Sequence, residues 1–120
     1  MILSQGRRNL LLAMLLAPLA RAAEPQVFEL EVADRKPKGG ARTVRIVKGE
    51  RVTLRVRSDE AMTLHVHGLD RELAVQPGVE AMFEIDGRMT GRFPVTAHLH
   101  AAPGRKVPEP TLLYLEVHPQ

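Results

Sequence analysis

The chain has 120 residues, of which 26% are charged, and it contains neither cysteine nor tryptophan. The absence of cysteine excludes disulfides, thiol catalysis and any thiolate-ligated metal centre. The formal net charge of +3 depends on Arg7, Arg8 and Arg21, because residues 23–120 carry 14 basic and 14 acidic side chains. With only three Phe and one Tyr, this part has no basic, aromatic-rich surface for nucleic acid, and no such partner is expected.

Residues 1–22 have the three zones of a signal peptide: Arg7 and Arg8, an apolar run over 10–17, and small residues at 20–22. The apolar run is shorter than the roughly 20 residues that cross a membrane, so no permanent membrane span is expected. The two arginines also resemble a twin-arginine export signal, so the general secretory route and the twin-arginine route both stay open. We expect a periplasmic or secreted protein.

The remaining residues, 23–120, have the size of one domain. Apolar and polar residues alternate along five segments, as in strands with one buried face: 28–32, 52–57, 79–86, 93–100 and 113–117. Short turns with Gly or Pro separate them, and a Pro-rich loop spans 101–110. This pattern predicts an all-β sandwich or barrel with Phe83 and Phe93 in its core.

Four of the five histidines form two copies of one motif, His65 with His67 and His98 with His100. On a strand, residues i and i+2 point to the same side. If the two strands are neighbours, the four imidazoles would form one cluster suited to copper, and zinc would also be compatible. Histidines in this pattern can also lie on the solvent-exposed face of an ordinary strand and bind no metal. His118 is expected to be a solvated tail residue.

Methionine thioethers are the other candidate copper ligands. Met62 has the phase of a core residue, Met82 lies on a polar face and Met89 lies in a turn, so packing roles are the default. The only serine after the signal segment, Ser58, is placed in a turn between charged residues without a nucleophile elbow. We therefore do not expect an enzyme.

Several segments together resemble the periplasmic cupredoxin-like domains, including the related domain of cytochrome oxidase subunit II. The similar segments are Lys48–Val56 with Leu64–Asp70, the Pro-Gly turn and strand of Gln76–Ile85, and the hairpin of Gly91–His100 with Leu113–Val117. The resemblance implies a Greek-key β-sandwich over residues 23–120, with any metal bound at one pole.

The chain departs from this family at one ligand position. Blue-copper members would carry a cysteine near Ala97, with a histidine at the position of His100. The resemblance therefore implies a branch without cysteine, which either uses an all-histidine site or has abandoned copper.

Our leading hypothesis is an exported copper-binding protein that serves binding, delivery or sensing, with His65, His67, His98 and His100 as ligands. The alternative is a metal-free sandwich that acts as an interaction or accessory module for a periplasmic protein partner.

Overall fold

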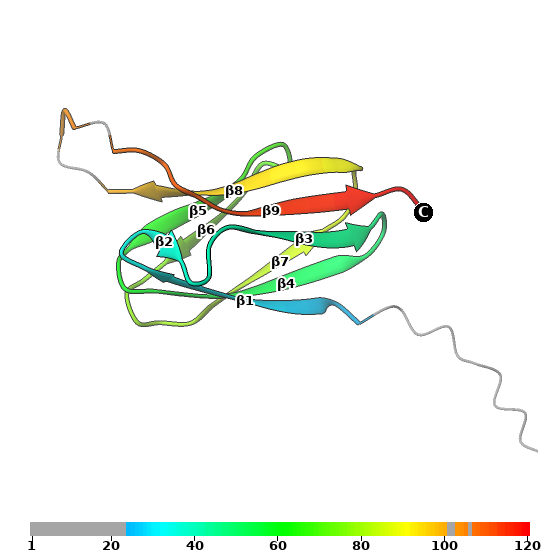
Figure 1. Cartoon of the computed structure of the whole chain (residues 1–120), viewed down its shortest axis with the longest axis horizontal. Coiled ribbons are helices and arrows are strands. Elements are labelled where there is room, and N and C mark those ends of the chain that lie inside the picture. The colour runs from blue at the N-terminus through cyan, green and yellow to red at the C-terminus, as the bar shows by residue number, and fades with distance from the viewer. Residues whose placement is uncertain (1–23, 101–102, 106) are drawn as a thin grey trace, which may run out of the picture.

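The computed structural model describes residues 24–100, 103–105 and 107–120, and the predicted signal peptide lies outside this range. Its strands are β1 (Gln26–Ala33), β2 (Lys36–Pro37), β3 (Arg42–Val47), β4 (Arg51–Ser58), β5 (Met62–Val66), β6 (Arg71–Val75), β7 (Ala81–Asp86), β8 (Gly91–Leu99) and β9 (Thr111–His118). They form two sheets that face each other as a sandwich (Figure 1). Within this described part, no helix has the length and apolar character needed to cross a membrane.

The two sheets are mixed and interleaved in sequence. The first has the order β2-β1-β4-β7 and the second the order β3-β9-β8-β5-β6. β1 runs parallel to β4 and β3 parallel to β9, while the other pairs are antiparallel. The chain thus changes sheet after β2, β3, β4, β6 and β7, and the last two strands, β8 and β9, lie in the same sheet. The all-β Greek-key sandwich expected from the sequence is confirmed.

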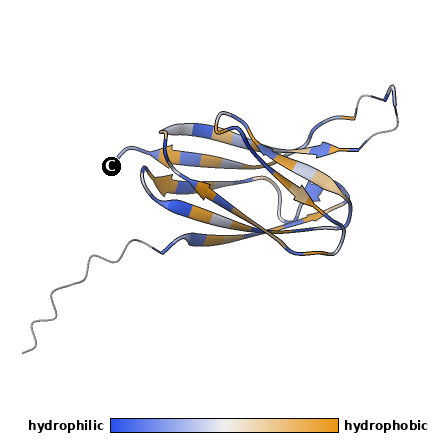
Figure 2. Ribbon diagram, turned by 180° about the vertical axis from the view of Figure 1, so that it is seen from behind, coloured by the Kyte–Doolittle hydropathy of each residue, from blue (hydrophilic) through white to orange (hydrophobic). Residues whose placement is uncertain are grey.

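The alternating apolar residues fill the space between the sheets. Phe83 is 2% exposed, and Phe93 and Met62 are also buried. Figure 2 shows hydrophilic and hydrophobic residues alternating along the strands. The inward phase predicted for these three residues is therefore confirmed, and the opposite residues of each strand form the two outer faces.

Some local predictions were wrong. Val79 is 58% exposed because β7 begins only at Ala81, after a turn in which the Val79 N–H donates to the Gln76 carbonyl at 3.2 Å. Ser58 was placed in a turn, but it is the last residue of β4 and is buried. Its hydroxyl is satisfied there, because it donates to the Glu60 carbonyl at 2.8 Å and accepts from the Glu60 N–H at 3.1 Å. The prediction also omitted β2, β3 and β6. β2 has no buried residue and β6 only Val75, whereas β3 contributes the buried Val44 and Ile46.

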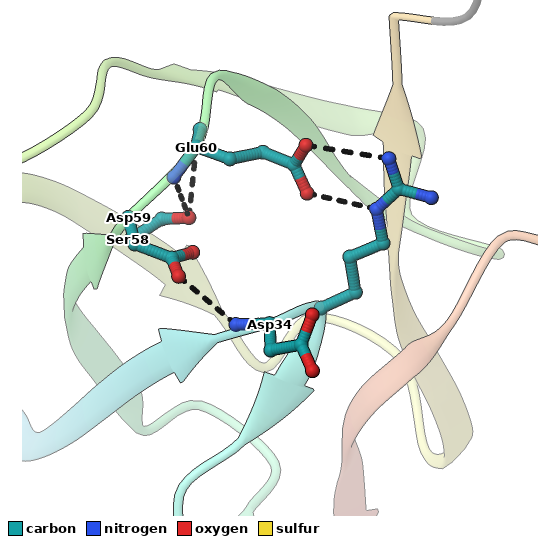
Figure 3. Close-up of polar contacts among 5 residues, drawn as sticks. Asp34, Ser58, Asp59 and Glu60 are labelled. Carbon is teal, nitrogen blue, oxygen red and sulfur yellow. Dashed lines mark hydrogen bonds and ion pairs between the residues drawn. The ribbon is translucent and has the colours of Figure 1, made fainter.

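The turn between β1 and β2 is held against the connection from β4 to β5. Asp34 and Arg35 have φ values of 51° and 62°, a left-handed conformation that costs side-chain-bearing residues free energy. Asp59 accepts the Asp34 N–H at 3.0 Å, and Glu60 accepts two hydrogen bonds from Arg35, at 3.0 and 3.4 Å (Figure 3). The hydrogen bond to Glu60 raises the pKa of Arg35. These contacts fix the segment in which the chain crosses to the second sheet and begins β5.

The core assignment is testable with two adjacent residues of β7. Phe83→Ala should lower the free energy of unfolding by about 3–5 kcal/mol, because it leaves a cavity between the sheets. Met82→Ala is the matched control, since Met82 is 56% exposed, and it should change stability by no more than about 0.5 kcal/mol. Chemical denaturation followed by circular dichroism measures both. Equal losses for the two variants would contradict the assignment.

Candidate metal centre

The two histidine motifs lie on adjacent strands. β5 and β8 pair antiparallel in the second sheet, which is the arrangement that the clustering hypothesis required. Val66 and Ala97 are fully buried on the inner face. Because side chains alternate along a strand, His65 and His98 project from the outer face of this sheet. His67 lies in the turn directly after β5, and its ring is close to that of His65.

The register of this pair decides which imidazoles meet. His65 lies opposite Thr96 and His98 opposite Thr63, so His65 and His98 are diagonal neighbours. Their ring centroids are 5.7 Å apart, and the rings of His65 and His67 are 4.4 Å apart in an edge-to-face arrangement. Three imidazoles therefore form a row, which we call the histidine row, with His65 in the middle.

His100 lies beyond the end of this row. β8 ends at Leu99, which pairs with Met62, the first residue of β5. On the other side, the pairing with β9 begins at Thr96 and Thr111. Neither neighbouring strand extends to position 100, and His100 is exposed. The structure thus brings three of the four proposed ligands together and leaves the fourth outside the sheet.

Each outer imidazole of the row has a polar partner that the sequence pattern did not predict. The Nε2 atom of His67 is 2.8 Å from the Thr96 hydroxyl, beside an irregularity in the β8–β9 register at Val95 and Thr96 that changes local side-chain direction. The Nδ1 atom of His98 is 2.6 Å from the Glu109 carboxylate. Both partners depend on long-range geometry, which a sequence pattern does not contain.

The central imidazole lacks such a partner. The Nδ1 atom of His65 is buried without a hydrogen bond, and its Nε2 atom is 3.9 Å from a carboxylate oxygen of the fully exposed Asp70, beyond hydrogen-bond distance. Buried polar atoms are normally satisfied, because leaving one unpaired costs about 1–3 kcal/mol. A metal ion bound by this ring would supply a partner, and this orphaned nitrogen is the feature that best fits a metal.

The geometry fits a metal only in part. Across residues 24–100, 103–105 and 107–120, no three histidine, aspartate or glutamate side chains already stand where they could hold one ion. The histidine row needs side-chain rotation between staggered conformers to converge on a metal. Imidazole nitrogen suits copper and zinc. The described residues therefore offer neighbouring imidazole nitrogens on one face, without His100 and without a preformed three-ligand site.

The other candidates named from the sequence lie elsewhere. His118 is the last residue of β9, so it belongs to a strand and not to a tail. Its side chain is exposed, as expected, and its Nε2 atom is 3.2 Å from the Glu116 carboxylate. Met62 is buried in the core, and Met82 and Met89 are exposed. None of these residues belongs to the histidine row.

Comparisons with known proteins bear on the fold. No model of a known protein family matches the sequence, and no curated protein sequence matches it. Among solved structures, the chain is similar to a blue copper oxidase from Nitrosomonas europaea, with 18% identity, a TM-score of 0.61 and coverage of 81% of this chain and 40% of the other.

Two further solved structures are similar. A heme-copper terminal oxidase shares 20% identity at a TM-score of 0.57, covering 78% of this chain and 65% of the other. A multi-copper oxidase from Pseudomonas thermotolerans shares 22% identity at a TM-score of 0.60, and the match covers 80% of this chain and 30% of the other. The chain therefore spans less than two thirds of the length of these proteins, and its fold is cupredoxin-like, as the sequence resemblance implied.

The turn after His67 can be tested with two glycines. Gly68 has a φ of 91°, and a Cβ atom there would lie 2.7 Å from a ring carbon of the core residue Phe93. Gly78 has a similar φ of 71° with open space around it. Gly78→Ala should therefore cost only backbone strain, about 1 kcal/mol.

Gly68→Ala should cost clearly more than Gly78→Ala, because it adds a clash with Phe93 to the same kind of strain. Thermal or chemical unfolding of both variants measures the difference. If the two variants were equally stable, the close packing of this turn on the core would be contradicted.

Proposed function

We propose that this protein is exported and binds copper as a cargo, on the outer face of its second sheet, through His65 and its neighbours His67 and His98. The observation that carries the proposal is the histidine row, in which the central ring has a buried Nδ1 atom without a partner. The similar structures include a blue copper oxidase and a multi-copper oxidase, which supports a copper-related role.

The opposite outer face has a different character. On the first sheet, Arg55 contacts Glu29 at 3.7 Å and Glu80 at 3.0 Å, and Arg51 contacts Glu84 at 3.4 Å. Such exposed ion pairs contribute little to stability, but they fill that face with paired charges. Of the two outer faces, as far as the structure describes them, only that of the second sheet carries histidine nitrogens, which is why we assign the site to that face.

Exposure favours exchange of the bound ion. The side chain of His65 is 19% exposed and that of His98 is 44% exposed, so a partner protein could reach a metal held there. This favours binding, delivery or sensing over catalysis. Because the chain has no cysteine, the Cu(II) form should lack the intense blue band of a thiolate centre.

Titration calorimetry with Cu(II) on the exported protein, purified without an affinity tag, tests the proposal. His65→Ala should weaken binding at least about tenfold, a loss of about 1.4 kcal/mol, because it removes the central ligand. His98→Ala should also weaken binding. His100→Ala is the matched control and should leave the affinity unchanged, since His100 lies outside the row.

The pH dependence gives a second check. Neutral imidazole is the ligand form, so protons compete with the metal, and the Cu(II) affinity measured by calorimetry should fall as the pH is lowered.

Unchanged Cu(II) affinity in His65→Ala would refute the site. A parent protein that binds no Cu(II) would refute the function and favour the metal-free interaction module.

A further inference from the structure

We infer that Glu109 is a positioning residue of this site. Its carboxylate would hold His98 in the tautomer that carries hydrogen on Nδ1, leaving Nε2 as the nitrogen that binds the metal. This inference rests on the proposed function, and it assigns a role to a residue of the loop between β8 and β9.

The contact itself dictates the tautomer. Nδ1 of His98 is 2.6 Å from Oε1 of Glu109, an ion-pair distance at which a nitrogen without hydrogen and a carboxylate oxygen would repel each other. An ionised carboxylate can only accept hydrogen bonds, so the imidazole must donate from Nδ1. A neutral imidazole carries a single N–H, and its lone pair then lies on Nε2.

The loop presents Glu109 with little conformational freedom. Glu109 lies between Pro108 and Pro110. Proline fixes its own φ, and the residue before a proline is restricted to extended conformations. The N–H of Ala97 donates to the Pro110 carbonyl at 3.0 Å, which anchors this end of the loop beside His98. The carboxylate is therefore held next to the ring at a low cost in conformational entropy.

The other contacts of the histidine row do not select a tautomer. The Thr96 hydroxyl near His67 can either donate or accept a hydrogen bond, and Nδ1 of His65 has no partner. Among the contacts described for these rings, only that of Glu109 fixes which nitrogen is free. Carboxylate partners of this kind orient metal-binding histidines and raise their basicity, and their loss commonly lowers metal affinity 10–100-fold.

Two measurements on Glu109→Ala test the inference. Nitrogen-15 NMR of the metal-free protein should show His98 with hydrogen on Nδ1 in the parent, and a loss of this fixed tautomer in the variant. Calorimetry should show Cu(II) binding weakened by about 10–100-fold. Glu109→Gln keeps an acceptor oxygen without the charge, so it should retain the tautomer and weaken binding less. It also carries the test if Glu109→Ala fails to fold.

Glu116→Ala is the matched control, because Glu116 pairs with His118 at 3.2 Å outside the histidine row. It should leave the His98 tautomer and the Cu(II) affinity unchanged. An unchanged tautomer in Glu109→Ala, or parental affinity in that variant, would overturn the role of Glu109. Failure of the proposed function would be recognised separately, from the absence of Cu(II) binding in the parent's own titration.

Discussion

The antiparallel pairing of β5 with β8 determines what the outer face of the second sheet can do. It places His65 opposite Thr96, so that His98 becomes a diagonal neighbour of His65. The core protects this arrangement, because a slip by one residue would turn the buried Leu64 and Val66 outward and bring the imidazoles inside. The histidine row is thus fixed by apolar packing on the other side of the same strands.

The fold could be predicted from the sequence because alternation reports directly which face of a strand is buried. The same alternation could not predict the register in which β5 pairs with β8. If the two motifs faced each other directly, His65 would lie opposite His100, four residues from its observed partner Thr96. Both registers bury the same residues, since an even shift preserves the face. The pattern of buried residues therefore cannot distinguish a register that forms a four-histidine cluster from one that forms a row of three.

The remaining parts of the site come from irregular structure. Thr96 reaches His67 beside the irregularity between β8 and β9, and Glu109 reaches His98 from a loop. The fold is shared with copper oxidases, but a fold does not by itself define a site. The residue near which the sequence resemblance would place a cysteine, Ala97, is buried between the sheets. In this chain, the candidate ligands lie instead on the outer face.

A crystal structure of the Cu(II)-loaded protein, with the metal located by its anomalous scattering, tests the central claim most directly. We predict a copper peak on the outer face of the second sheet, bonded to a nitrogen of His65 and also to His67, His98 or both. Copper bound only at His100 or His118, or no copper on this face at saturating metal, would contradict it.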